Sequence, residues 1–105
     1  MGPKEFVHNF YLQKEDLLAT YIDPNEETSV GELIKSMQLN QEQFQILKQV
    51  LDNCLTDGFY AILLGLDGAA SIGNEQHDYK ILNENGAEIS GGDIESFAWE
   101  FFQKE

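Results

Sequence analysis

The stretch FYAILLGL, residues 59–66, decides the fold predicted for this chain. All of its residues except Gly65 have apolar or aromatic side chains, and it directly follows Gly58, a residue type common at helix ends. A continuous apolar run of this length indicates a strand that is covered on both faces and is therefore central in its sheet. The sequence before this run predicts helices, and the sequence after it predicts short strands.

Apolar residues recur at helical spacing three times before the run. Pro24 ends the first of these patterns. Ser29 and Glu32 have the spacing of a capping box at the start of the second. Asn40 and Gln43 have the same spacing at the start of the third. The sequence therefore predicts helices at residues 6–22 (one helix or two short ones), 29–37 and 41–56.

Turn signals divide the sequence after the run into short segments. Asp67-Gly68 and Asn85-Gly86 are two-residue hairpin signals, and Asp93 is positioned to cap a last helix. We therefore expect strands at residues 59–66, 69–72, 77–83 and 87–90 and a helix at 93–103. The predicted fold class is α+β, a single domain over residues 1–105. Its N-terminal helices and C-terminal helix pack on an antiparallel β-meander of three to four strands.

The charge of the chain limits its partners. The 105 residues include 19 Asp and Glu against 6 lysines and no arginine, a formal net charge of −13. Phosphate backbones and anionic membranes are bound largely by Lys and Arg, so this balance argues against direct nucleic-acid or membrane binding. The acidic residues are spread over both halves of the chain. They would complement a basic protein partner and accelerate its association.

Cysteine content and hydropathy indicate a compartment. Cys54 is the only cysteine, so no disulfide can form within the chain. No apolar stretch approaches the length of a membrane span, and the first residues lack the apolar run of a secretory signal. These features predict a cytoplasmic protein.

The sequence contains no catalytic, cofactor-binding or metal-binding motif, which predicts a protein that is not an enzyme and needs no cofactor. Cys54 lies between Asp52 and Asp57, whose charges disfavour the reactive thiolate. One alternative is a small-molecule-binding or enzymatic domain with a pocket near Asp67, His77 and Asp78. A second alternative is a mimic of the nucleic-acid surface, with carboxylates in place of phosphates.

The last helix carries the candidate binding residues. At 100° per residue its apolar side chains share one face, whereas Trp99 points off that face and Phe102 lies at its edge. Either the helix is wedged between two layers or part of it is an apolar patch that a partner buries. We predict that Trp99 and Phe102 anchor a protein partner and that Glu95 and Glu100 guide it. Two copies could also pair through this helix as a homodimer.

Residues 60–102 resemble the C-terminal part of the SUKH superfamily, which includes bacterial toxin-immunity proteins. The resemblance rests on the apolar run leading into Asp67-Gly68, residues 79–82, Asn85-Gly86, and residues 95–97 at the start of an aromatic helix. It implies an α+β fold and an immunity-type role, in which the protein inhibits a basic partner. It assigns no site residue in this chain.

Overall fold

Residues 59–66 form the last part of a helix in the computed structural model, which describes residues 1–104. This helix, α3, spans Gln41–Leu66 and continues through Gly58, where a Cβ atom would meet nothing within 4 Å. A continuous apolar run has no clear period, so it fits a buried helix as well as a buried strand. The predicted α+β fold is therefore wrong, because the described residues form four helices and no sheet.

The end of α3 lies at Asp67-Gly68, which is a helix cap and not a hairpin. Gly68 has a φ of +77°, a conformation that glycine adopts without strain. Its amide donates to the carbonyl of Gly65 at 3.1 Å, and the amide of Ala69 donates to the carbonyl of Leu64 at 2.9 Å. These two bonds define a Schellman motif. The predicted helix of residues 41–56 thus continues ten residues further, to Leu66.

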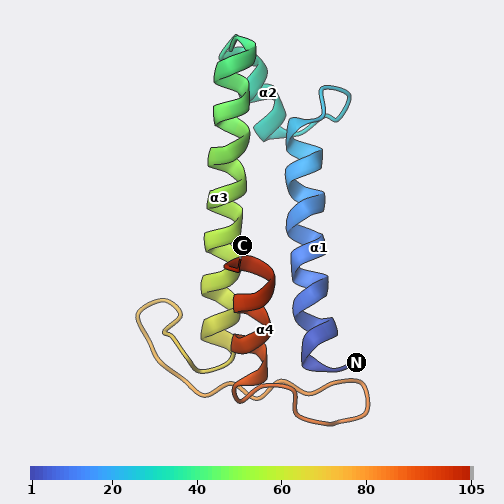
Figure 1. Cartoon of the computed structure of the whole chain (residues 1–105), viewed down its shortest axis with the longest axis vertical. Helices are drawn as coiled ribbons and strands as arrows, with labels where there is room; N and C mark the ends of the chain where they lie inside the picture. The colour runs from blue at the N-terminus through green and yellow to red at the C-terminus, as the bar shows by residue number, and fades with distance from the viewer. Residues whose placement is uncertain (105) are drawn as a thin grey trace.

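The two long helices lie side by side and antiparallel (Figure 1). The short α2 joins them at one end, and α4 packs on both of them near the other end. As a result α4 covers only about half the length of the pair, and the molecule is elongated, with extents of 48 × 28 × 26 Å. The helices are α1 (Pro3–Ile22), α2 (Ser29–Ser36), α3 (Gln41–Leu66) and α4 (Asp93–Phe102).

The capping residues at the helix N-termini agree only in part with the prediction from sequence. Asn40 and Gln43 form the reciprocal capping box at the start of α3, with hydrogen bonds of 2.8 and 3.0 Å. At α2 the cap is Thr28, whose Oγ1 accepts from the amide of Gly31 at 2.8 Å, and not Ser29. Helix α1 is unbroken and begins at Pro3, a residue that fits the first turn because it needs no amide partner there.

The segment between α3 and α4 crosses the end of the molecule as a loop (Figure 1). The strands predicted at 69–72, 77–83 and 87–90 are absent, and only two isolated bridges occur, Ile72 with Glu75 and Leu82 with Glu88. The chain reverses at Asn85-Gly86, but the flanking residues do not extend into a ladder. Residues 71–80 are all exposed, so they bury no apolar face that could stabilise a sheet.

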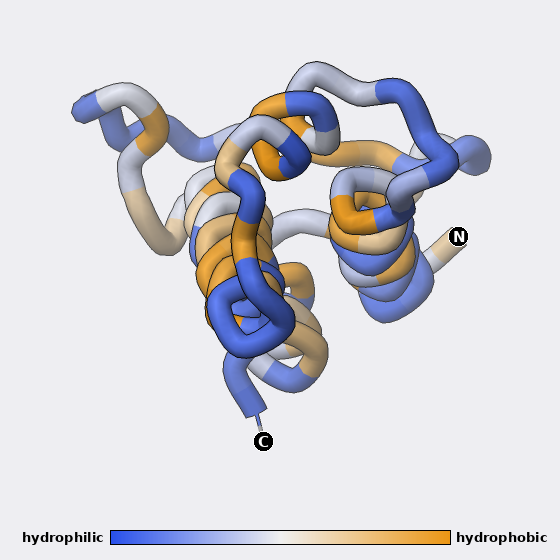
Figure 2. Tube along the Cα trace, turned by 90° about the horizontal axis from the view of Figure 1, so that it is seen from above, coloured by the Kyte–Doolittle hydropathy of each residue, from blue (hydrophilic) through white to orange (hydrophobic). Residues whose placement is uncertain are grey.

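The core lies where α4 meets the two long helices. Hydrophobic and hydrophilic positions alternate along these helices (Figure 2), as expected for helices with one covered face. Over residues 1–104, no helix combines the length and hydropathy that crossing a lipid bilayer requires. The buried apolar side chains are Val7, Leu63, Ile89, Ile94, Ala98 and Phe102.

Candidate functional site

Trp99 borders an open hollow between α3 and α4. The hollow has a volume of about 450 Å³ and is lined by Tyr60 from α3 and by Glu95, Ser96 and Trp99 from α4. Trp99 is 50% exposed, more than any other Phe, Tyr or Trp side chain of the described residues. Glu95 and Trp99 are one helical turn apart and therefore share a face. The hollow combines two aromatic rings with a carboxylate, a set that suits a cationic side chain.

The other face of α4 fixes this geometry. Ile94, Ala98 and Phe102 are buried between the long helices. The ring of Phe102 stacks on that of Phe59, with centroids 6.3 Å apart, and meets the edge of Tyr11 at 5.6 Å. Phe102, predicted to anchor a partner, thus lies in the core with 8% of its surface exposed. The candidate surface therefore depends on Trp99 and not on Phe102.

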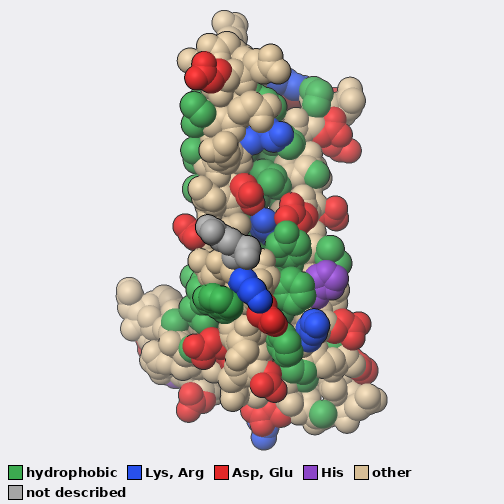
Figure 3. Space-filling view, viewed as in Figure 1, with side chains coloured by type: hydrophobic (Ala, Val, Ile, Leu, Met, Phe, Trp, Pro, Cys, Tyr) green, Lys and Arg blue, Asp and Glu red, His purple; other side chains and the backbone are tan. Residues whose placement is uncertain are grey.

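The two predicted acidic guides differ in position. Glu95 lines the hollow, whereas Glu100 is exposed about 100° around α4 from Trp99 and is not among the lining residues. Asp57 is exposed on α3, one turn before Tyr60. Figure 3 shows both acidic and lysine side chains on the surface around α4. Among the residues that line the hollow, Glu95 is the one that carries a charge.

Asp67 holds the start of α4 in place. Its carboxylate accepts from the backbone amides of Gly91 at 2.5 Å, Gly92 at 2.8 Å and Glu95 at 2.8 Å. The predicted cap, Asp93, makes no such bond, because the N-cap position is Gly92 and no side chain there accepts a hydrogen bond. A carboxylate near the helix N-terminus also interacts favourably with the helix dipole. Asp67 therefore connects the end of α3 to the helix that carries Trp99.

The predicted pocket near Asp67, His77 and Asp78 is only partly assembled. Asp78 lies close to Gly68, so it is near Asp67, but the Asp67 carboxylate is already occupied by three amides. His77 has a 58% exposed side chain, and its Nε2 lies 3.9 Å from a carboxylate oxygen of Glu75. Within residues 1–104, no group of three or more His, Cys, Asp or Glu side chains could hold a metal ion.

Among residues 1–104, Lys14 is the one charged residue that is buried, with 4% of its surface exposed. Its Nζ lies 2.8 Å from an Asp52 carboxylate oxygen and 3.3 Å from one of Glu15, and 5.0 Å from the centroid of the Tyr11 ring. Burial alone would lower the pKa of Lys14, but the hydrogen bonds to Asp52 and Glu15 outweigh it and raise the pKa. The ammonium group is thus fully partnered, so we assign it a structural role.

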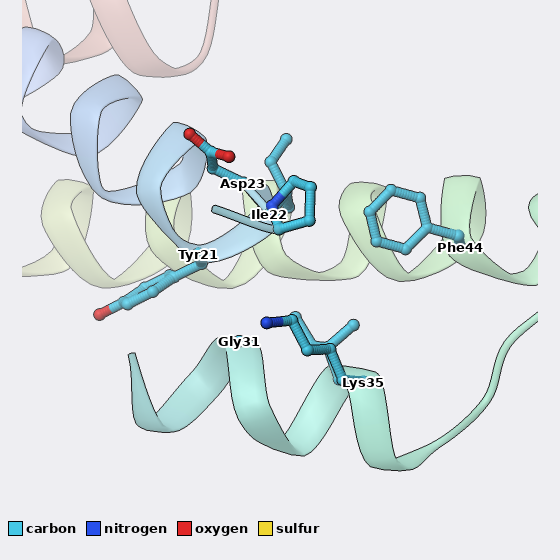
Figure 4. Close-up of a pocket in the computed structure, with 8 residues that line it drawn as sticks. Tyr21, Ile22, Asp23, Gly31, Lys35 and Phe44 are labelled. Atoms are coloured by element: carbon cyan, nitrogen blue, oxygen red, sulfur yellow. The ribbon is translucent and has the colours of Figure 1, made fainter. Parts of the chain in front are cut away.

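A second cavity, of about 200 Å³, lies between α2, the end of α1 and the start of α3 and was not predicted (Figure 4). Its lining is mainly apolar, with Tyr21 and Phe44 among the contributing side chains. Lys35 is its single cation and lies 3.5 Å from Glu32, while Asp23 accepts from the amide of Asn25 at 2.9 Å. No convergent set of free polar groups faces this cavity, so its chemistry points to no particular ligand.

Sequence reasoning identified Trp99 and Glu95 but missed Tyr60, because residue 60 was assigned to a strand. A helix continuing through Gly58 would have placed Tyr60 on α3. Comparisons with protein-family models, curated proteins and solved structures found no match for this chain.

Proposed function

We propose that this chain is an acidic, non-enzymatic protein-binding domain that docks on a basic partner through the Trp99 hollow. The single observation that carries the proposal is the half-exposed Trp99 beside Tyr60 and Glu95. A large aromatic side chain left in water on a small domain is typical of a binding anchor. The net charge of −13 supplies the complementary field for a basic surface.

The occupant of the hollow in this proposal is an Arg or Lys side chain of the partner. Its cationic head lies against the face of Trp99, and its charge is compensated by Glu95. A cation on an aromatic face contributes about 0.5 to 2 kcal/mol, more when the pair is shielded from water. A carboxylate beside the rings favours a cation over a neutral side chain of similar size.

We propose that binding of this kind inhibits the basic partner, as an immunity-type protein does. By occupying the basic surface of a partner, an acidic domain blocks what that surface would otherwise bind. The strands on which the resemblance to the SUKH superfamily rested are helix and loop here, so this role is argued from the acidic charge and the Trp99 hollow and not from that resemblance. A cytoplasmic location, favoured by the single cysteine, belongs to the same proposal.

The proposal is tested by calorimetry with an arginine-rich peptide and a control peptide in which glutamine replaces arginine. Wild-type protein should bind the first peptide and not the second, and Trp99→Ala should weaken binding about tenfold. Tyr79→Ala is the matched control, because Tyr79 is an exposed aromatic residue of the loop between α3 and α4, at 39% exposure, and does not line the hollow. Equal binding by wild type and Trp99→Ala would overturn the proposal.

A further inference from the structure

One row of α3 residues is exposed along most of the helix and carries no charge. Its members are four residues apart, so they form a single ridge, and residues at this spacing are the ones by which helices most often pack together. Ile46, Val50 and Ile62 are 55%, 49% and 49% exposed. We call this row the α3 ridge; it comprises Ile46, Val50, Cys54, Gly58 and Ile62.

An uncharged groove between α1 and α3 adjoins the α3 ridge, and Cys54, Gly58 and Ile62 of the ridge form part of its wall. It consists of two hollows of about 240 and 230 Å³ that share Phe59. By the helical period, Asn9 and Gln13 lie on the side of α1 turned away from Tyr11, which contacts α4. The groove therefore opens on the face opposite α4. Its lining is uncharged throughout and comprises Asn9, Phe10, Gln13, Leu17, Cys54, Leu55, Gly58, Phe59 and Ile62.

Nothing within one chain requires a glycine at position 58. Its φ is not positive, and a Cβ there would meet no atom within 4 Å. A glycine inside a helix nevertheless costs about 1 kcal/mol relative to alanine. By contrast, a Cβ on Gly65 would lie 2.7 Å from Cδ1 of Ile72, so that glycine has a neighbour that explains it. A missing side chain in the middle of an exposed apolar ridge allows another helix to approach closely.

We propose that the α3 ridge and the groove form an interface with a second copy of this chain. The two α3 helices cross near Gly58, and each ridge packs into the groove of the other copy. A two-fold contact of this kind uses the same patch on both partners. The α3 ridge and the groove lining carry no charged side chain, so the contact itself would bury no carboxylate, and Asp57 borders the ridge at an exposed position. The two chains, each of net charge −13, repel each other at long range, which salt screens.

The chain leaves more surface uncovered than a compact monomer of its mass. The accessible surface is 7056 Å², whereas a monomer of 11.9 kDa is expected to expose about 5,950 Å². The excess is about 1,100 Å² over the whole chain, to which the exposed residues 71–80 contribute, and a standard interface buries roughly 800 Å² on each partner. The radius of gyration, 16.4 Å against about 13 Å expected for this length, reflects the same elongation. The Trp99 hollow lies on the α4 side, so this inference is independent of the proposed function.

Sedimentation equilibrium over a wide range of protein concentration tests the inference, with added salt to screen the net charge. Wild-type protein should reach the mass of two chains. Gly58→Lys should remain monomeric, because the new side chain fills the crossing point. Asn53→Lys makes the same charge change at an exposed site about 140° around α3 from Gly58, away from the crossing point, and should dimerise like the wild type.

Two further measurements separate loss of the interface from loss of the fold. Gly58→Lys should melt no lower than wild type when both are dilute, since position 58 is open in the single chain. Ile62→Lys, at a second exposed position of the ridge, should also be monomeric. A short bismaleimide should cross-link Cys54 between copies of wild type and of Asn53→Lys, but not of Gly58→Lys. A wild type that stays monomeric, or a Gly58→Lys variant that dimerises as tightly as Asn53→Lys, would overturn the inference.

Discussion

The carboxylate of Asp67, at the C-terminal end of α3, accepts a hydrogen bond of 2.8 Å from the backbone amide of Glu95 in the first turn of α4. The two residues are 28 positions apart and are joined by a loop without regular structure. The same carboxylate also accepts from the amides of Gly91 and Gly92. Because α4 has no side-chain cap of its own, Asp67 determines where the helix bearing Trp99 begins.

Replacing Asp67 should therefore destabilise the domain. We expect Asp67→Ala to lower the free energy of unfolding by about 0.5 to 2 kcal/mol, the usual range for loss of a helix cap. Urea unfolding followed by circular dichroism measures the change. Asp93→Ala is the matched control, since Asp93 is also acidic and lies in the first turn of α4 but makes no capping bond. Equal losses from the two variants would contradict the capping role of Asp67.

Helix α3 shows why the local sequence patterns predict its start correctly but predict a strand where its last residues, 59–66, are helical. The Asn40–Gln43 box marks the start of α3 because both partners are close in sequence. The other end depends on α1 and α4, against which Phe59, Tyr60 and Leu63 pack, and this tertiary packing makes helix the favoured state of an apolar run without a clear period. Gly58 suggested a helix end, but in the structure it is an ordinary helical position.

The candidate site was predictable to the extent that it depends on α4 alone. The helical period places Trp99 off the buried face and Glu95 one turn before it, as the structure has them. The burial of Phe102 depends on Tyr11 and Phe59, which belong to other helices. The role of Asp67 could not be read from sequence, because its partners lie 24 to 28 residues away across the loop.

The two glycines of α3 should respond oppositely to alanine. Gly58→Ala should raise the free energy of unfolding by about 1 kcal/mol in dilute protein, because the added methyl group favours helix and meets no neighbour. Gly65→Ala should gain less or lose stability, because its methyl group displaces Ile72. Thermal or urea unfolding at low protein concentration compares them. A larger gain for Gly65→Ala than for Gly58→Ala would contradict the packing described for Ile72.

Stability should decline at alkaline pH. The pKa of Lys14 is raised above its ordinary value of 10.5, and that of Tyr11 is raised above 10.0, mainly by its hydrogen bond to Glu15. For both groups the folded state holds its proton more tightly. Their contribution to stability is therefore complete below the ordinary values and is lost as pH rises through the raised ones.

Unfolding free energies measured from neutral pH to above both ordinary pKa values test this prediction. Lys14→Met should show a shallower alkaline decline than wild type, because one of the two linked groups is gone. Lys4→Met, at an exposed lysine of the same helix, should follow the wild-type curve. If Lys14→Met declined as steeply as wild type, the linkage assigned to the Lys14 ammonium would be wrong.

The central claim is that the Trp99 hollow, and not the overall acidity of the chain, recognises a basic partner. The most direct test compares the affinities of Glu95→Lys and Glu27→Lys for the same arginine-rich peptide. Each variant replaces a charge of −1 by +1, so both change the net charge from −13 to −11. Glu95 lines the hollow, whereas Glu27 is exposed in the loop between α1 and α2. We predict that Glu95→Lys binds the peptide about tenfold more weakly than Glu27→Lys, because only the first reverses a charge at the contact. Equal affinities would contradict the claim, since binding would then follow net charge alone.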